Sequence, residues 1–204
     1  MKIAVLAESP ADRRAIEVLA RAILDREVEF VAIQPRSGGF HAVVSAIGPT
    51  LRGLHYRRLA DGLIVVVDSD NTPIDPHDAN SRVQHIQNEI AQVQANLTSM
   101  PELKPIKTAV GVAAPSLEAW LLFGIDSQCT ETGWVVCRND GQLSATEIRR
   151  LKEQLYGTDR PDLVLETERM VGRSTDLIRE DRLEALAQAF PYGFGQLLND
   201  LRGW

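Results

Sequence analysis

An uninterrupted apolar run at residues 62–67 is the feature that most restricts how this chain can fold. Its sequence, Gly-Leu-Ile-Val-Val-Val, has no polar alternation and therefore predicts a strand buried on both faces of a parallel sheet. The run leads directly into Asp68-Ser69-Asp70. Because open α/β sheets bind ligands just beyond the carboxyl ends of their strands, Asp68 and Asp70 are candidate ligand-binding residues. An aspartate-rich turn that only closes the strand is the alternative.

Strand and helix patterns alternate over the first part of the chain. Apolar segments predict four strands, at residues 3–7, 29–33, 62–67 and 108–114. A first helix is expected to begin at Ser9-Pro10, since serine favours the N-cap and proline the first helical position. A second helix is expected over residues 42–59, interrupted at Gly48-Pro49. This order predicts an α/β fold, with a parallel Rossmann-like sheet of about four strands and helices on both faces.

The rest of the chain is less regular. Residues 1–125 are expected to form the α/β core, and residues 126–204 a mainly helical extension packed on it, in one compact unit. Ser144 and Glu147 have the spacing of a capping box and predict the start of a helix. A short edge strand is expected at residues 134–137. The two cysteines, Cys129 and Cys137, have the spacing of neither a disulfide framework nor a zinc site.

Charge and hydropathy exclude some classes of protein. The net charge of −6 argues against a protein that coats nucleic acid through overall positive charge. No apolar stretch approaches the ~20 residues of a membrane-spanning helix, and no signal peptide precedes the first strand. We therefore expect a cytoplasmic protein with no membrane partner. An enzyme acting on nucleic acid is still compatible with this composition, because clustered metal-binding carboxylates themselves add negative charge.

Four acidic residues are expected at one edge of the sheet. Glu8 follows the first strand, Asp68 and Asp70 follow the third, and Glu118 lies in the first turn of the helix after the fourth. Carboxylates this close repel one another, and a bound Mg2+ or Mn2+ would remove that repulsion. Such an ion activates water and stabilises charge on a phosphoryl group, which predicts phosphodiester or phosphomonoester chemistry. Each acid also has a simpler explanation, in a solvated turn or at a helix N-terminus.

The ordered set of motifs resembles the TOPRIM superfamily. The resemblance rests on the strand-terminal Glu8 before a helix, and on the apolar strand that enters Asp68-Ser69-Asp70. Residues 114–122, Ala-Pro-Ser-Leu-Glu-Ala-Trp-Leu-Leu, are similar to the Pro-x-x-Glu-x-Trp-x-Leu stretch of small bacterial RloB-like proteins, a branch related to the OLD (overcoming-lysogenisation-defect) nucleases. The resemblance covers residues 1–125 well and the later aromatic segment, residues 190–194, loosely.

This resemblance implies a Mg2+-dependent nuclease that cleaves DNA or RNA. By position, Glu8 takes the role of general acid/base or metal ligand, Asp68 and Asp70 bind the metal, and Glu118 matches an additional acidic position. Small members of the superfamily often accompany ATPases in bacterial defence loci, which implies an ATPase partner and a setting in anti-phage defence. The sequence specifies no oligomeric state, and an oligomer is compatible with it.

Three basic residues are candidate contacts to a nucleic-acid substrate. Arg13 and Arg14 follow Glu8 by about one helical turn, close enough to meet a phosphate near a bound metal. Lys152 is the candidate for the lysine that larger nucleases of this class place near their metals. Lys107, in contrast, is expected at the opposite edge of the sheet. For Arg13, Arg14 and Lys152, the alternative is a solvated helix face.

Two other functions would use the same aspartates. Residues 68–72 fit the Asp-x-Asp-x-Thr motif of haloacid-dehalogenase-like phosphatases, with Asp68 as nucleophile and Asp70 as acid/base. That motif normally ends the first core strand, whereas two strand–helix units precede it here. The third hypothesis is a module without catalytic activity that binds metal or a partner protein, which the acidic charge and the amphipathic helices would suit.

Overall fold

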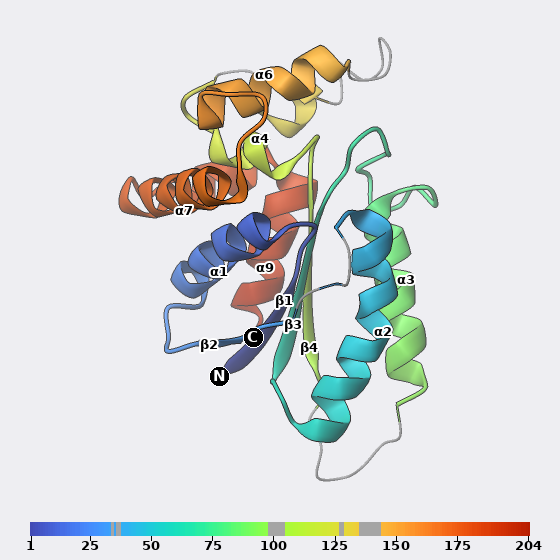
Figure 1. Cartoon of the computed structure of the whole chain (residues 1–204). Coiled ribbons are helices and arrows are strands. Elements are labelled where there is room, and N and C mark those ends of the chain that lie inside the picture. Colours follow the sequence, from blue (N-terminus) through green and yellow to red (C-terminus); the bar gives the residue numbers. More distant parts are fainter. Residues whose placement is uncertain (34, 36–37, 98–104, 127–128, 135–143) are drawn as a thin grey trace.

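Four parallel strands form the centre of the structure, a computed structural model that describes residues 1–33, 35, 38–97, 105–126, 129–134 and 144–204 (Figure 1). The sheet has the order β2-β1-β3-β4. Its strands are β1 (Lys2–Leu6), β2 (Glu29–Val31), β3 (Gly62–Asp68) and β4 (Lys107–Ala113). The α/β fold predicted from the sequence is confirmed, and each strand lies within two residues of its predicted bounds.

Strand β3 is central because it pairs with both β1 and β4. Successive side chains of a strand point to opposite faces of its sheet, so the apolar run supplies two cores at once. Val65 and Val67 lie in the core on one face, whereas Ile64 and Val66 lie in the core on the other. This double burial explains why the run shows no alternation of polar and apolar residues.

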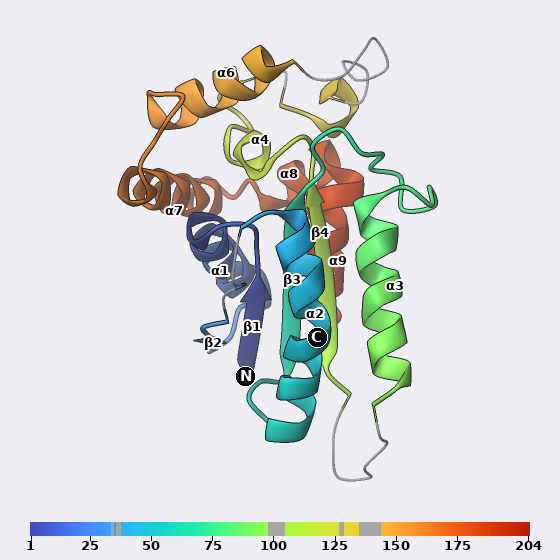
Figure 2. The same cartoon turned by 45° about the vertical axis from the view of Figure 1, so that its right-hand side comes forward.

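Helices α2 (Phe40–Arg57) and α3 (Arg82–Ala95) cover the first face of the sheet (Figure 2). The predicted interruption of α2 at Gly48-Pro49 is wrong, since Pro49 lies inside one continuous helix. Pro49 itself is exposed, whereas Ile47 and Leu51 on either side of it are fully buried against the sheet. Packing of this buried stripe outweighs the backbone hydrogen bond that the proline removes.

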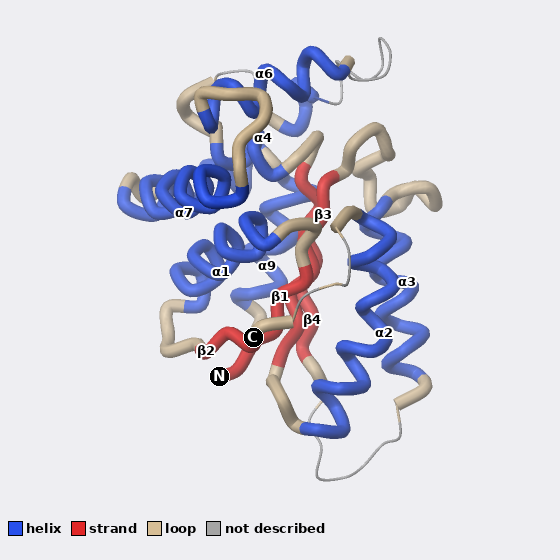
Figure 3. The backbone as a smooth tube through the Cα atoms, in the orientation of Figure 1, coloured by secondary structure: helices blue, strands red, loops and turns tan. Residues whose placement is uncertain are grey.

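The second face is covered by segments from both ends of the chain. Helices α1 (Pro10–Leu24) and α9 (Gln196–Arg202) pack on the sheet, and α7 (Leu163–Arg179) packs on α1 (Figure 3). The remaining labelled helices are α4 (Leu117–Leu121), α6 (Ala145–Tyr156) and α8 (Leu183–Ala189). The C-terminal extension therefore completes the core of one sheet face. None of the described helices combines the length and the apolar character needed to cross a bilayer.

Local capping signals explain several helix starts. Ser9 and Asp12 form a capping box at the start of α1, and Ser144 and Glu147 form the predicted one at the start of α6. The edge strand predicted at residues 134–137 is wrong at Trp134, which belongs to a helical turn that includes residues 131–134. Thr130 Oγ1 accepts a hydrogen bond from the backbone N–H of Gly133 and so caps this turn. Residues 135–137, which include Cys137, lie outside the described residues.

Gly193 lets the π-helical segment η1 (Pro191–Gly195) approach the sheet closely. A Cβ atom at this position would lie well inside contact distance of the Val112 carbonyl oxygen in β4. We expect Gly193→Ala to lower the free energy of unfolding by about 1–3 kcal/mol, because backbone has to move. Chemical denaturation of the purified variant measures this change.

A glycine in an open helical position provides the control. A Cβ at Gly172, within α7, would meet no neighbouring atom. Gly172→Ala should therefore raise the free energy of unfolding by about 0.5–1 kcal/mol, through the higher helix propensity of alanine. Equal effects of the two substitutions would contradict the close approach of Gly193 to β4.

Candidate functional site

The carboxyl ends of β1, β3 and β4 meet at one edge of the sheet, near α4 in Figure 1. The chain after β3 stays beside the chain after β4 for two further residues. Ser69 N–H donates to the Ala113 carbonyl at 2.7 Å, and Asp70 N–H donates to the Pro115 carbonyl at 3.0 Å. This pairing fixes the backbone of the Asp-x-Asp motif against the segment that leads into Glu118.

Asp68 links the acidic residues of this edge. Its Oδ1 atom accepts a hydrogen bond from Leu117 N–H, at the start of α4, over 2.9 Å. Its own N–H donates to Glu8 Oε1 at 3.0 Å. The structure therefore brings Glu8, Asp68 and the first turn of α4, which carries Glu118, to one place. These are three of the four acids that the sequence placed at this edge.

Asp12 is a further acid of this group that the sequence analysis missed. Burial, followed by the charge of Glu118, raises the pKa of Asp12 to about 7, although its hydrogen bonds with Ser9 act in the opposite direction. Its carboxylate accepts from Ser9 N–H at 2.9 Å. The sequence carries one signal for Asp12, which is an acid four residues after Glu8. Asp12 also has the capping-box spacing from Ser9, and this structural role is a sufficient explanation for an acid at that position.

The direction of the pKa shift of Asp68 reflects the acids around it. Burial raises that pKa well above its ordinary value, and the charges of Asp12, Glu118 and Glu8 raise it further, in that order. The hydrogen bond from Leu117 offsets only part of this effect. We call Asp12, Asp68 and Glu118 the acidic group. The charges of Asp12 and Glu118 destabilise the charged form of Asp68, and the charge of Glu118 does the same to Asp12.

Asp70 lies outside the acidic group. Its side chain is 56% exposed and forms an ion pair with Arg82, with 2.6 Å between Asp70 Oδ2 and Arg82 Nη2. The backbone of Asp70 has a φ of 46°, in the left-handed region that aspartate tolerates better than most residues. Arg82 also faces Glu8, at 3.5 Å from Nη1 to Oε1. Arg82 is the second functional candidate that the sequence analysis missed.

The C-terminal extension contributes polar side chains to Glu118. The buried Tyr156 hydroxyl, from α6, donates to Glu118 Oε1 at 3.2 Å. Lys152, one turn earlier on α6, has its Nζ atom 3.9 Å from the same oxygen. Glu166, from α7, has a raised pKa, caused first by burial, while the charge of Lys152 lowers it. Lys152, predicted as a substrate contact, therefore lies beside the acidic group.

Arg13 and Arg14, the two arginines predicted to contact a substrate, both form ion pairs with Glu17. Arg13 Nη1 lies 3.4 Å from Glu17 Oε1, and Arg14 Nη1 lies 2.9 Å from Glu17 Oε2. Glu17 is buried, so both arginines are held on the side of α1. Lys107 pairs in register with Gly62 at the opposite edge of the sheet, as the sequence predicted.

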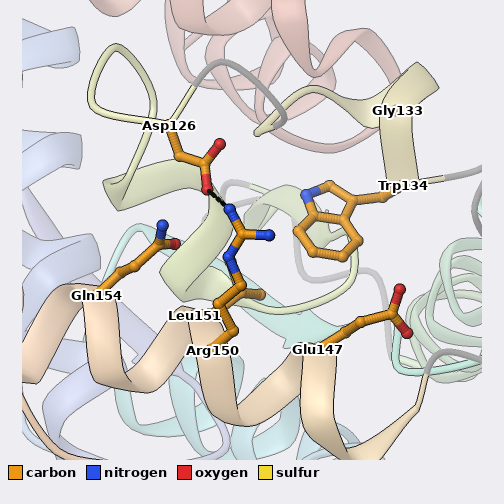
Figure 4. A pocket seen from close by; sticks show the side chains of 7 residues that line it. All are labelled: Asp126, Gly133, Trp134, Glu147, Arg150, Leu151 and Gln154. Carbon is orange, nitrogen blue, oxygen red and sulfur yellow. Dashed lines mark ion pairs between the residues drawn. The ribbon is translucent and has the colours of Figure 1, made fainter.

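A separate cavity of about 120 Å³ lies between α6 and the segment that carries Asp126, Gly133 and Trp134 (Figure 4). Figure 4 shows that Arg150 points into it and pairs with Asp126, with 3.5 Å between Nη2 and Oδ2. The indole of Trp134 forms another wall. This volume is well below the roughly 300–1,000 Å³ of pockets that hold cofactors or drug-sized ligands, so the cavity is too small for a nucleotide.

No three His, Cys, Asp or Glu side chains form a ready-made metal-binding group within the part of the chain that the structure describes. Comparison with protein-family models, curated proteins and solved structures found no match. The structure is that of an α/β protein with a parallel sheet and a group of interacting, partly buried carboxylates at the carboxyl ends of its strands.

Proposed function

We propose that this protein is a Mg2+- or Mn2+-dependent nuclease of the TOPRIM type, which hydrolyses phosphodiester bonds in DNA or RNA. The observation that carries the proposal is the acidic group, where Asp12, Glu118 and Glu8 all raise the pKa of Asp68. A divalent cation bound there would relieve this repulsion. The sequence resemblance supports the same function, and it alone supports an ATPase partner and a role in defence.

The donors of the acidic group suit such an ion. All are carboxylate oxygens, the ligands that Mg2+ and Mn2+ prefer. Mg2+ usually keeps several waters and binds through one or two carboxylates, so Asp68 with Asp12 or Glu118 would hold it. When bound, the ion would supply an activated water and a positive charge for the phosphoryl group.

Glu8 is the candidate general base. The Asp68 N–H orients its Oε1 atom, and burial raises the pKa of Glu8 above the ordinary glutamate value. A higher pKa makes a carboxylate a stronger base, which suits proton abstraction from water near neutral pH. Glu8 would thus take the proton of the attacking water while the acidic group holds the ion.

Tyr156 positions Glu118 within the proposed site. Its hydroxyl donates to one carboxylate oxygen, and the aromatic ring is buried. Tyr156→Phe keeps the ring and loses the hydrogen bond, so we expect the dissociation constant for Mn2+ to rise by about fivefold, the equivalent of about 1 kcal/mol. Isothermal titration calorimetry measures it. Tyr192→Phe, at a half-exposed ring on η1, should leave Mn2+ binding unchanged; equal affinities for wild type and Tyr156→Phe would contradict the positioning role.

Three substrates separate the candidate activities. Supercoiled plasmid, single-stranded RNA and p-nitrophenyl phosphate are each incubated with wild type, Glu118→Gln and Glu153→Gln in Mg2+ or Mn2+. We expect a polynucleotide to be cleaved by wild type and by Glu153→Gln, whose side chain is exposed on α6, and Glu118→Gln to be inactive. Turnover of the monoester alone would favour the phosphatase hypothesis. Turnover of no substrate would favour a module without catalytic activity.

A further inference from the structure

Arg82, the first residue of α3, ties together three segments at the carboxyl edge of the sheet. Its Nη2 atom lies 2.6 Å from Asp70 Oδ2, and its Nη1 atom lies 3.5 Å from Glu8 Oε1. Nη1 also donates to the Asp68 carbonyl oxygen. The guanidinium lies over the ring of Phe40, 4.4 Å from its centroid, and the arginine side chain is only 13% exposed. Arg82 is therefore held firmly from several sides.

The contacts of Arg82 divide the acids of this edge into two sets. Glu8 and Asp70 both pair with Arg82. The acidic group lies beside them, and within it Lys152 lies 3.9 Å from Glu118. A guanidinium keeps its charge at every pH that a protein tolerates. Glu8 and Asp70 consequently have a permanent counter-cation. The electrostatic repulsion between Asp12 and Asp68, in contrast, is largely uncompensated.

We infer that Arg82 is a positioning residue that competes with a divalent cation for Glu8 and Asp70. The inference rests on the proposed function, because it concerns the same metal site. A 2+ ion at Asp68 would lie close to the fixed positive charge of Arg82, whose Nη1 touches the Asp68 carbonyl, and like charges at such distances repel. Arg82 therefore weakens metal binding and confines the ion to the acidic group. Removal of the Arg82 charge would open Glu8 and Asp70 to the ion.

The direction of the effect distinguishes competition from a purely structural role. Wild type, Arg82→Gln, Arg82→Lys and Arg57→Gln are titrated with MnCl2 by calorimetry. We expect Arg82→Gln to bind Mn2+ about tenfold more tightly, since one repelling charge is gone. Arg82→Lys keeps the charge and should stay near wild type. Arg57→Gln removes an exposed charge in the last turn of α2, away from the acids, and should change nothing.

Thermal unfolding adds a readout that is independent of activity. Without metal, Arg82→Gln should melt below wild type, because the ion pairs of Arg82 with Glu8 and Asp70 are lost. Saturating Mn2+ should then raise its melting temperature by more than it raises that of wild type, since tighter ligands stabilise more. Should Arg82→Gln prove too unstable to purify, Arg82→Met removes the same charge, keeps an unbranched side chain over the Phe40 ring, and should tighten Mn2+ binding in the same way.

The possible results separate the inference from the proposed function. If wild type binds Mn2+ and Arg82→Gln binds it equally or more weakly, the competing role of Arg82 is overturned. The nuclease proposal would still stand in that case. If neither wild type nor Arg82→Gln binds Mn2+, the metal-dependent function is overturned, and the inference about Arg82 is overturned with it. Tighter binding by Arg82→Lys as well would also overturn the inference, because the charge would then not be the cause.

Discussion

Replacement of Asp68 with asparagine is expected to abolish measurable Mn2+ binding and to lower polynucleotide cleavage by about a thousandfold. Asp68 interacts with Asp12, Glu118 and Glu8, so it is the acid through which the others are connected. Asparagine has the same shape and can still accept the hydrogen bond from Leu117 N–H, but it carries no charge. A metal ion supplies several kcal/mol of transition-state stabilisation, which corresponds to a thousandfold at about 4 kcal/mol. Calorimetry and single-turnover cleavage measure the two losses.

The same substitution should stabilise the metal-free protein. Desolvation, and after it the charges of Asp12, Glu118 and Glu8, disfavour the charged form of Asp68 and raise its pKa. We expect Asp68→Asn to raise the free energy of unfolding at pH 8 by about 2 kcal/mol. Asp78→Asn, in the exposed loop before α3, is the matched control and should change neither stability nor Mn2+ binding. An Asp68→Asn protein that is less stable and binds Mn2+ normally would show that Asp68 has only a structural role.

The metal-free protein is expected to become less stable as the pH rises from about 4 to about 7. The pKa of Asp12 is about 7 in the folded protein against 3.8 in the unfolded chain, and that of Asp68 is raised as well. Between these pH values the folded state binds more protons than the unfolded state, so stability falls with rising pH. The difference between the folded and unfolded pKa values of Asp12 corresponds to a loss of up to about 4 kcal/mol in the free energy of unfolding, at about 1.4 kcal/mol per pKa unit. Urea denaturation at a series of pH values between 4 and 8 measures this slope.

Two comparisons assign the slope to the acidic group. Asp12→Asn removes the titrating carboxyl, so its stability should depend less on pH than that of wild type over the same range. Saturating Mn2+ should also reduce the slope, because a bound cation favours the charged carboxylates. Parallel pH curves for wild type and Asp12→Asn would contradict the raised pKa of Asp12.

The fold could be predicted from the sequence because buried elements leave recognisable patterns of apolar residues. The six apolar residues before Asp68 predict a strand with both faces covered, and β3 is that strand. Two predictions were wrong where packing or a cap prevailed over residue preference. Pro49 lies within a helix whose opposite side is buried, and Trp134 belongs to a helical turn that Thr130 caps.

The candidate site was harder to predict, since it depends on where side chains reach. Glu8, Asp68 and Glu118 could be placed because each follows the carboxyl end of a strand. In an extended strand, Asp68 and Asp70 would point to the same side. The positive φ of Asp70 ends that alternation, and its carboxylate pairs with Arg82. Arg82 lies on the next helix, and no periodicity of the sequence predicts how far a guanidinium extends.

The position of Mn2+ in a crystal of the wild-type protein would show whether the acidic group binds a metal ion. Anomalous diffraction from crystals soaked in MnCl2 would locate the ion. We predict a peak at the carboxyl edge of the sheet, with an oxygen of Asp68 and one of Asp12 or Glu118 about 2.1 Å from the ion. A peak elsewhere would mean that the acidic group is not the metal site. The absence of any peak at saturating Mn2+, with the Asp68 carboxylate still hydrogen-bonded to Leu117 N–H, would mean the same.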